Sequence, residues 1–366
     1  MNAPNTPPDP QPYLEPSSSR HWVNAPRVIL SCAGGVVILL LIFLPHAAAP
    51  AYLAAFMLFA TLPLGACALL MLHMAVGTSW GDAIRPELER AAGATPLLVV
   101  FILPIACTRA FLYPWAHAGP HHPYFDPRLI ALRTIVFLAL WGAAGPWLAR
   151  ASRRTLLGAR AAPAPRAVAC VGLVLYVLSV TFAFTDWISS LDPSWHSSMF
   201  GLIVVCTQGL SAMAFAVAVS CRSHRRREPP TPAALRDLGN LLLAFAILHA
   251  YVSFSQFFII WNSDVPGRTQ WYLPRSRGLW LGAVSACAIL QFAIPLGAML
   301  FGRLKASPSI LRMLGVIILF GSFLEAAWIT LPSTSGGPLA RLLYPLFCTC
   351  LGLLFLPFLL PRPAQA

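Results

Sequence analysis

The sequence has 366 residues, of which 58% are hydrophobic and only 10% are charged. Soluble domains carry about 25% charged residues, so this composition argues against a soluble enzyme and favours an integral membrane protein. The net charge of +13 would suggest a nucleic-acid partner in a soluble protein. Here most arginines fall in the connections between apolar spans, so no nucleic acid is expected.

Ten apolar spans, each long enough to cross a bilayer as a helix, lie between residues 27 and 360. The predicted fold is an all-α polytopic membrane domain with ten transmembrane helices over 27–360. Residues 1–26 are predicted to form a disordered cytoplasmic tail, because the first 20 are rich in Pro and Ser and lack the apolar core of a signal peptide. Residues 361–366 are predicted to form a short cytoplasmic C-terminal tail. The spans are approximately 27–45, 51–74, 96–113, 129–149, 167–186, 197–220, 237–261, 279–301, 309–330 and 341–360.

The distribution of basic residues predicts the orientation of the chain in the membrane. With the N-terminus in the cytoplasm, 18 of the 25 Lys and Arg residues lie in inner segments and six in outer ones, while Arg109 lies within a span. Cytoplasmic connections of membrane proteins carry the excess of positive charge. Both termini are therefore expected on the cytoplasmic side of a bacterial inner membrane.

The span at 237–261 carries polar side chains where a simple anchor would have none. His249, Ser253 and Gln256 recur at i, i+4 and i+7, so they share one face of the helix. His249 falls near the bilayer midplane, where a polar group must face protein or water rather than lipid. This helix is expected to line an interior, with Asp237, Asn240 and His73 forming its inner mouth.

Gln208 and Gln291 lie at a depth comparable to that of His249, on the spans before and after it. If the three helices are neighbours, these side chains form one polar layer that can hold water and relay protons. The same residue types also hold membrane helices together by hydrogen bonds. A proton relay and a structural role therefore both stay open.

Glu325 is an acidic residue inside the ninth span, close to its outer end. A carboxylate at this depth must be protonated, paired or in contact with water, and such residues are by default candidates for function. Arg109, in the outer part of the third span, is the counter-charge that the sequence offers. The alternative to a functional role is that Glu325 and Arg109 form a purely structural ion pair.

The connection at 186–201, with the sequence DWISSLDPSWHSSMFG, lies at the predicted outer face. Asp186, Asp192 and His196 are able to pass protons to the outer water at ordinary pKa values. A capped turn between two helices explains the same residues. An aromatic belt at the membrane boundary explains most of the tryptophans, but Trp187, Trp195 and Trp261 cluster beside acidic residues.

Redox centres are not expected in this chain. Its nine cysteines show no CxxC or CxxCH spacing, so iron–sulfur, zinc and c-type haem sites are not encoded. A b-type haem needs two histidines at one depth on facing helices, and His249 is alone at the midplane. Phosphate-binding glycine loops and nucleophile motifs are also absent from the sequence.

Several of these stretches resemble one known family. DWISSLDPSWHSSMFG, LRDLGNLLLAFAILHAYVSFSQFFIIW, the QWYLPR segment and the eighth span are similar to the NrfD-like membrane subunits of the ActF type. These belong to alternative complex III, a bacterial quinol:cytochrome c oxidoreductase. The resemblance covers about residues 50–330. The positions that match the family are Asp186, Trp187, Asp192, Trp195, Asp237, Asn240, Tyr251, Ser255, Gln256 and Trp261.

The resemblance implies ten helices arranged as two four-helix bundles with a peripheral helix at each end. It implies partner subunits that carry iron–sulfur clusters and haem c, and a sister NrfD-like subunit that oxidises quinol. Trp187, Trp195, Tyr251, Trp261 and Arg109 are then candidates for a quinone site or a subunit interface. The chain departs from the family at His249, where Trp is common.

The sequence therefore predicts a multi-pass subunit of a quinol-oxidising respiratory complex, with a proton path that includes Asp237, His249, Gln256, Gln208, Glu325 and Asp186. Two other functions stay open. The chain can be a purely structural anchor for the complex, or a free-standing secondary transporter.

Overall fold

A computed structural model of the protein describes residues 19–77, 79–116, 123–156, 165–193, 195, 197–222, 231–263 and 269–360. In this part of the chain all regular elements are helical, which confirms the all-α prediction. The helices are α1 (Ser19–Phe43), α2 (Pro45–Val76), α3 (Arg85–Gly93), α4 (Leu97–Phe101), α5 (Leu103–Cys107), α6 (Arg109–Leu112), α7 (Pro127–Leu156), α8 (Pro165–Trp187), α9 (Phe200–Ser220), α10 (Pro232–Ser263), α11 (Gly278–Ala288), α12 (Ile294–Met299), α13 (Gly302–Lys305), α14 (Pro308–Thr330) and α15 (Gly337–Leu359).

Eight helices among the described residues are long and apolar enough to cross a membrane, and nine if one bent pair counts as a single span. The bent pair joins α3 to the segment Leu97–Cys107 at 45°. Pro96 lies at this bend, and Pro104 lies beside the break between α4 and α5. Proline has no N–H to donate to the preceding turn, so it interrupts the helix at both places. The apolar part of α1, Ile29–Phe43, is shorter than a full span. The chain is a multi-pass membrane protein, while the count of ten stays a prediction.

Helices α2 and α9 form the interior of the bundle. In each of them 78% of the most apolar stretch is buried, whereas only 17% is buried in Gly278–Met299. The two helices approach closely at Gly65, where a Cβ atom would lie 2.1 Å from the backbone oxygen of Gln208. A similar approach joins α14 to α9, since a Cβ on Gly315 would lie 2.6 Å from the oxygen of Ala214. Small residues at such crossings allow membrane helices to pack through their backbones.

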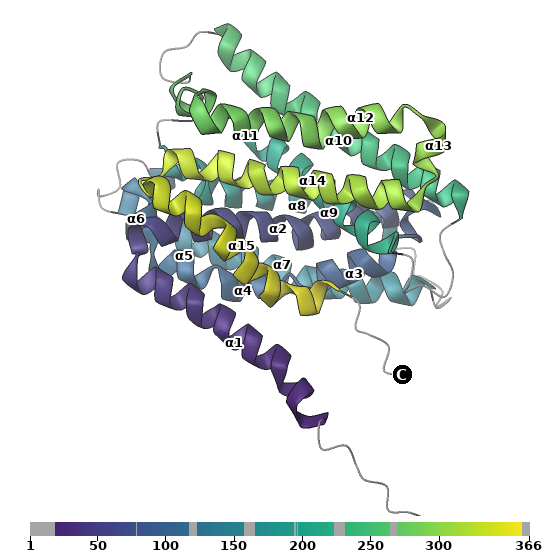
Figure 1. The fold of residues 1–366 in the computed structure, drawn as a ribbon, viewed down its shortest axis with the longest axis horizontal. Helices are drawn as coiled ribbons and strands as arrows, with labels where there is room; N and C mark the ends of the chain where they lie inside the picture. Colours follow the sequence, from purple (N-terminus) through teal and green to yellow (C-terminus); the bar gives the residue numbers. More distant parts are fainter. Residues whose placement is uncertain are drawn as a thin grey trace, which may run out of the picture.

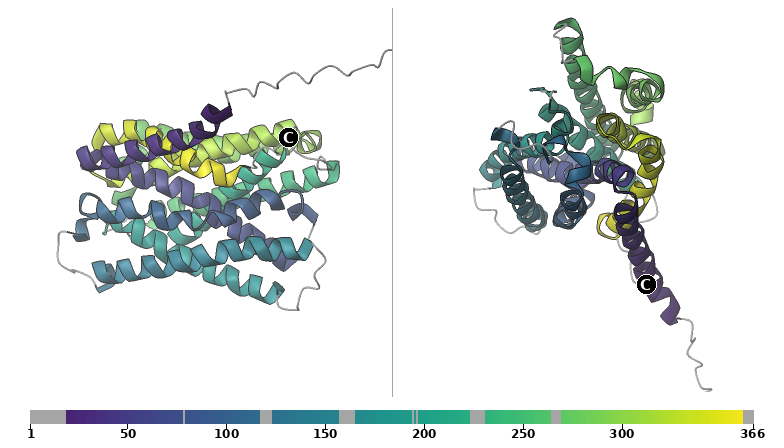
Figure 2. Two further views of the ribbon diagram at one scale, coloured as in Figure 1. Left: turned by 90° about the horizontal axis from the view of Figure 1, so that it is seen from below. Right: turned by 90° about the vertical axis from the view of Figure 1, so that its left-hand side faces the viewer.

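Most of the helices run roughly parallel to the long axis of the molecule, and α1 diverges from them (Figure 1). Helix α2 packs against α3, α7, α8, α9, α14 and α15, and α9 also contacts α10 and α14. Figure 2 shows α1 and the end of α10 projecting on opposite sides of the body. Helix α15 packs against α2, and α1 contacts both of these helices. The division into two four-helix bundles with two peripheral helices stays a prediction.

The outward faces of the outer helices are apolar. On α7, Leu132 and Ile135 are 58% and 64% exposed, and on α10, Phe254 and Phe258 are 64% and 54% exposed. Such a continuous apolar surface is stable only against lipid or another membrane subunit. The polar side chains of the spans point inward from this surface, and they form the sites described below.

Candidate functional site

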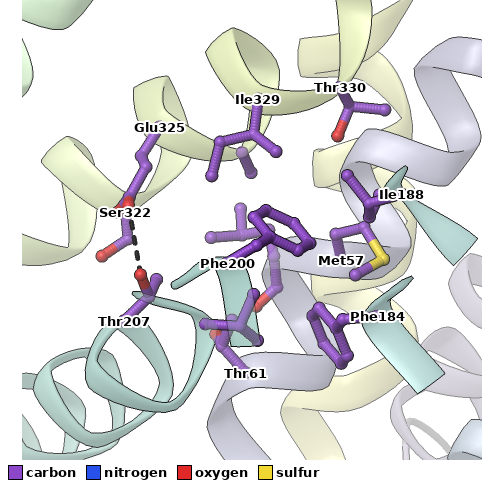
Figure 3. Close-up of a pocket in the computed structure, with 13 residues that line it drawn as sticks. Met57, Thr61, Phe184, Ile188, Phe200, Thr207, Ser322, Glu325, Ile329 and Thr330 are labelled. Atoms are coloured by element: carbon purple, nitrogen blue, oxygen red, sulfur yellow. Dashed lines mark hydrogen bonds between the residues drawn. The ribbon is translucent and has the colours of Figure 1, made fainter. Parts of the chain in front are cut away.

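A small cavity of about 40 Å³ lies among α2, α8, α9 and α14 (Figure 3). Glu325 and Ser322 of α14 and Thr207 of α9 supply polar atoms to its wall. Thr330 also lines it, and its hydroxyl oxygen is buried with no hydrogen-bond partner among the described residues. A cavity with this volume and these polar groups has room for at least one water molecule.

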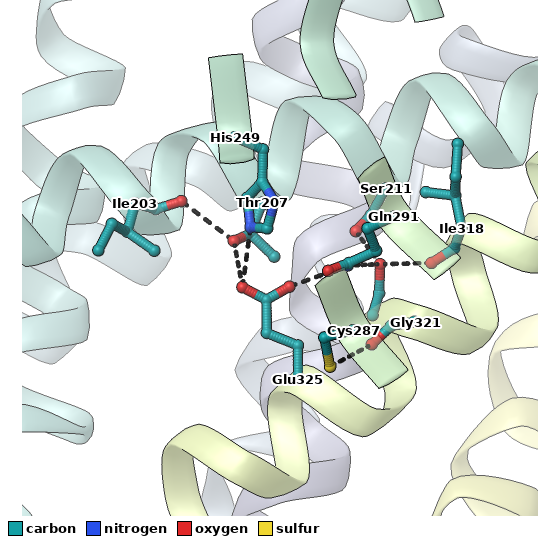
Figure 4. A network of polar contacts seen from close by, with 10 residues as sticks. Ile203, Thr207, Ser211, His249, Cys287, Gln291, Ile318, Gly321 and Glu325 are labelled. Carbon is teal, nitrogen blue, oxygen red and sulfur yellow. Dashed lines mark hydrogen bonds and ion pairs between the residues drawn. The ribbon is translucent and has the colours of Figure 1, made fainter. Parts of the chain in front are cut away.

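The carboxylate of Glu325 is bound by side chains from three other elements (Figure 4). Its Oε1 atom lies 2.9 Å from Nε2 of His249 on α10, and the Thr207 hydroxyl donates to the same oxygen at 3.1 Å. Gln291 donates from Nε2 to Oε2 at 3.0 Å. Glu325 and His249 are only 7% and 6% exposed. A buried carboxylate is tolerated in such a place only when it is paired and hydrogen-bonded, and both conditions are met.

The network continues from Glu325 toward the predicted inner side by one helical turn. Gln291 Nε2 also lies 3.2 Å from the Ser322 hydroxyl, which is 2.9 Å from the hydroxyl of Ser211 on α9. The Ser322 hydroxyl also lies 3.1 Å from the backbone oxygen of Ile318. Ser322 has one hydroxyl hydrogen, so it donates either to Ile318, with Ser211 then donating to Ser322, or to Ser211.

The position of Gln291 depends on an irregular turn of helix. Residues Ile289–Ala293 form a π-helical turn between α11 and α12, and the N–H of Ile294 donates to the oxygen of Ile289. Pro295 follows directly and has no N–H to donate to Gln291, which accounts for the wider turn. Gly321 makes room for the side chain, because a Cβ there would lie 2.5 Å from Cγ of Gln291.

The same face of α10 leads from His249 toward the predicted outer end. The Ser253 hydroxyl oxygen is buried and has no partner among the described residues, so it is available to water. Gln256 is 3% exposed, accepts from the Ser197 hydroxyl at 2.8 Å and donates to the Tyr272 hydroxyl at 3.0 Å. His249, Ser253 and Gln256 therefore face the protein interior together, as the sequence predicts.

The inner half of the predicted path is apolar. Asp237 is exposed at the inner end of α10. Between it and His249 the inward face carries Leu238, Leu242 and Ala246, all completely buried. Leu311, Leu314 and Ile318 of α14 are also completely buried. The expectation that Asp237 joins the polar track is therefore wrong. An apolar layer separates Asp237 from His249, and no polar side chain among the described residues bridges this layer.

Asp186 does not belong to this network either. Its oxygens accept from Arg133 on α7, from Nε at 2.8 Å and from Nη2 at 2.9 Å, and its side chain is fully buried. The Arg133 guanidinium also lies 4.2 Å from the ring centre of Tyr124. Asp186 thus points toward α7 rather than toward α14. The prediction that it continues the path from Glu325 is wrong.

Arg109 is not the counter-charge of Glu325. Glu325 pairs with His249, whereas Arg109 is exposed and lines a different cavity, next to Asp186 and Trp187. That cavity has a volume of about 450 Å³ and lies among α4, α5, α7 and the start of the connection after α6. Depth along the helices placed Arg109 and Glu325 at one level, but they lie on different sides of the bundle.

Gln208 is separated from the other members of the predicted polar layer. Its Oε1 accepts from the Tyr176 hydroxyl of α8 at 2.5 Å, and its Nε2 is buried without a described partner. Thr207, one residue earlier, reaches Glu325 instead. Adjacent residues of a helix point about 100° apart, so Thr207 and Gln208 serve different neighbours. Gln291 and His249 do meet, at Glu325.

The four aromatic candidates, Trp187, Trp195, Tyr251 and Trp261, lie in three different environments. Trp187 is buried and donates from Nε1 to Thr134 at 3.1 Å, and Trp195 stacks on Trp271 with ring centres 4.4 Å apart. Tyr251 and Trp261 are 67% and 70% exposed on the outward face of α10. His196 lies outside the described residues, and Asp192 is half-buried near the charge of Arg275.

Arg275 is a buried residue that the sequence reasoning missed. It is 1% exposed, and its guanidinium lies 3.6 Å from the ring centre of Trp271. Burial lowers the pKa of Arg275 to about 9, and the nearby Asp192 acts in the opposite direction, so the group stays charged at neutral pH. The tryptophans around an arginine in WYLPRSRGLW were the available signal. The Arg275 guanidinium donates to the backbone oxygens of Trp271 (2.8 Å), Trp328 (3.2 Å) and Ile329 (2.7 Å) and to the Ser333 hydroxyl (2.7 Å).

The expected inner mouth of His73, Asp237 and Asn240 is also divided. His73 Nε2 lies 2.9 Å from Arg85 Nη2, which donates to Asp82 at 2.7 Å. Asn240 instead accepts from Lys305 at 2.7 Å. These are two separate polar contacts on different helices.

Comparison of the sequence with protein-family models and with curated proteins finds no match.

Proposed function

We propose that the chain is a multi-pass subunit of a bacterial quinol:cytochrome c oxidoreductase of the alternative complex III type, and that its Glu325–His249 pair exchanges protons inside the membrane. The observation that carries the second part is the buried contact of 2.9 Å between the two side chains. Ionisable residues at this depth are rare in membrane helices and are by default candidates for proton transfer. The first part rests on the family resemblance of residues 50–330.

The chemistry of the site suits a proton that moves over short distances. A carboxylate and an imidazole in direct contact can share one proton, and both are common proton carriers at physiological pH. Thr207 and Gln291 hold the carboxylate in place, so that it does not need to reorient when its charge changes. The cavity beside Glu325 supplies space for water.

The proposed route runs from this pair toward the predicted outer side. Ser253 offers a buried hydroxyl that has no partner among the described residues, and Gln256 connects to Ser197 and Tyr272 nearer the outer end. Water that bridges His249, Ser253 and Gln256 would complete the route. The buried leucines of the inner half close the opposite direction. A complete crossing therefore requires water to enter that layer during turnover.

In this proposal the electrons move in partner subunits. The resemblance implies that iron–sulfur clusters and haem c belong to peripheral subunits and that a sister membrane subunit oxidises the quinol. The exposed aromatic face of α10, with Tyr251, Phe254 and Trp261, is apolar enough to lie against lipid or such a membrane partner. The chain itself contributes a proton-exchanging site to the complex.

A structural anchor is the second candidate, and the same contacts favour it. The side chains around Glu325 connect α9, α10, α14 and the π-helical turn, so they hold these elements together whatever else they do. Hydrogen bonds between membrane helices contribute about 1 kcal/mol each. The two functions differ in whether the exchangeable proton of Glu325 is needed.

Glu325→Gln separates these functions, because glutamine keeps the size and most hydrogen bonds of the side chain but does not release a proton. The intact complex that contains the variant would be reconstituted in liposomes, and protons moved per electron would be measured during quinol oxidation with a soluble electron acceptor. We expect a clear loss of proton movement with normal subunit content. Glu89→Gln, which changes a buried Glu paired with Arg153 outside the network, is the matched control.

An unchanged proton-to-electron ratio in Glu325→Gln would leave the anchor as the function. Membership of the complex has a separate test. Affinity purification of the tagged full-length chain from its native membrane should recover iron–sulfur and multihaem c subunits. Recovery of the chain alone would contradict the assignment to this complex, whatever the proton measurement shows.

A further inference from the structure

The large cavity of about 450 Å³ lies away from the Glu325 network, on the side of the bundle formed by α4, α5, α7 and the connection after α6. Most of its wall is aliphatic, with Ile102, Ile105, Ile130 and Leu138 at its buried side. Val99, Leu103 and Ile135 line it too and are 43%, 56% and 64% exposed. Because these exposed residues belong to the lipid-facing surface, an occupant enters sideways from the membrane.

Several polar groups at one end of this cavity are already satisfied within the protein. Asp186 is held by both nitrogens of Arg133, and the Trp187 indole donates to Thr134. The Tyr113 hydroxyl donates to the backbone oxygen of Trp187 at 3.0 Å. Asp186, Trp187 and Tyr113 therefore have no free donor for the carbonyl oxygen of a quinone.

Besides the Thr134 hydroxyl, two stronger donors at the cavity make no hydrogen bond or ion pair with a described residue. Arg109 makes no ion pair with any described residue, although it lies at the end of an apolar segment. The indole nitrogen of Trp115 is buried and has no hydrogen-bond partner among the described residues. A guanidinium at the membrane boundary needs an anion, and a buried indole N–H that lines the same cavity needs an acceptor.

We infer that this cavity binds one anionic phospholipid, with a fatty acyl chain in the apolar space and the phosphate at Arg109 and Trp115. The charge complementarity between the Arg109 guanidinium and a lipid phosphate selects the headgroup, because planar guanidinium groups bind phosphate through two parallel hydrogen bonds. The aliphatic wall selects the acyl chain. The site is independent of the proton exchange proposed above.

The test is lipid binding to the purified full-length chain in detergent, measured by native mass spectrometry with phosphatidylglycerol or phosphatidylcholine added at equal concentrations. We expect wild-type protein to retain phosphatidylglycerol in preference to phosphatidylcholine. Arg109→Gln should lower the retained phosphatidylglycerol at least fivefold. Arg341→Gln, which removes a positive charge from α15 outside this cavity, is the matched control and should bind as wild type.

Ala139→Trp tests the acyl-chain part of the site, because Ala139 lines the cavity and a larger side chain there fills it. We expect this variant to lose phosphatidylglycerol while Arg109 is still present. If Ala139→Trp does not fold, the paired comparison of Arg109→Gln with Arg341→Gln decides the question by itself. Equal retention of phosphatidylglycerol in those two variants, or equal binding of both lipids by wild type, would overturn the proposal. Displacement of phosphatidylglycerol by an equimolar short-chain quinone would also overturn it, and would assign the cavity to a quinone.

Discussion

The imidazole of His249 and the carboxylate of Glu325 lie 2.9 Å apart although 76 positions separate them in the sequence. Each comes from a different helix, α10 or α14, and each is almost completely buried. The contact turns two polar residues that are individually costly in a membrane into a mutually compensated pair. It also provides the first prediction about stability.

Removal of either partner should leave the other buried without compensation. We expect Glu325→Leu to lower the free energy of unfolding by about 3 kcal/mol, because His249, Thr207 and Gln291 all lose a hydrogen-bond partner. The double variant with His249→Phe should lose less than the sum of the single variants, by about 1–3 kcal/mol. Unfolding in detergent measures all three, and strict additivity would show that the two residues do not interact.

Gly321→Ala should displace Gln291 from Glu325. A Cβ at this position would lie 2.5 Å from Cγ of Gln291, and the neighbouring π-helical turn limits how far that side chain can move. We expect a loss of about 1–3 kcal/mol from overpacking, together with a lower proton-to-electron ratio in the complex. Gly282→Ala, on α11 with no atom within 4 Å of its added Cβ, should leave both quantities unchanged. A similar effect in both variants would point to general helix effects instead.

Asp186→Asn should lower the stability of the protein without changing its proton exchange. The change weakens the two hydrogen bonds with Arg133, each of which joins charged groups, so we expect a loss of about 2 kcal/mol in the free energy of unfolding. Because Asp186 lies outside the Glu325 network, the proton-to-electron ratio of assembled complex should equal that of wild type. A ratio as low as that of Glu325→Gln would return Asp186 to the proton path.

Arg275→Lys should weaken the outer end of the bundle. Lysine has no planar fork to stack on Trp271 or to reach the acceptors at Trp328, Ile329 and Ser333 together. We expect a loss of about 2 kcal/mol in unfolding free energy and a change in tryptophan fluorescence. The exposed neighbour Arg277 offers the control, and Arg277→Lys should change neither measurement.

Depth along each helix was readable from the sequence, but rotation about the helix axis was not. His249 and Gln291 were expected at one level, and they do meet, through Glu325. Arg109 was expected to pair with Glu325, and Asp186 was expected to continue the route from it, but both line the large cavity on another side of the bundle. Gln208 misses the network although Thr207 reaches it, since one residue changes the direction of a side chain by about 100°.

The amino-acid sequence by itself determined that this is an all-α, multi-pass membrane protein and that the face of α10 with His249, Ser253 and Gln256 points inward. Both follow from local properties, because the length of an apolar run and the helical period depend only on neighbouring residues. Only the tertiary structure decided that Glu325 pairs with His249 and Asp186 with Arg133. Which polar groups meet depends on how helices far apart in the sequence pack and turn toward one another, and here the close approaches at Gly65, Gly315 and Gly321 and the π-helical turn at Gln291 set that geometry.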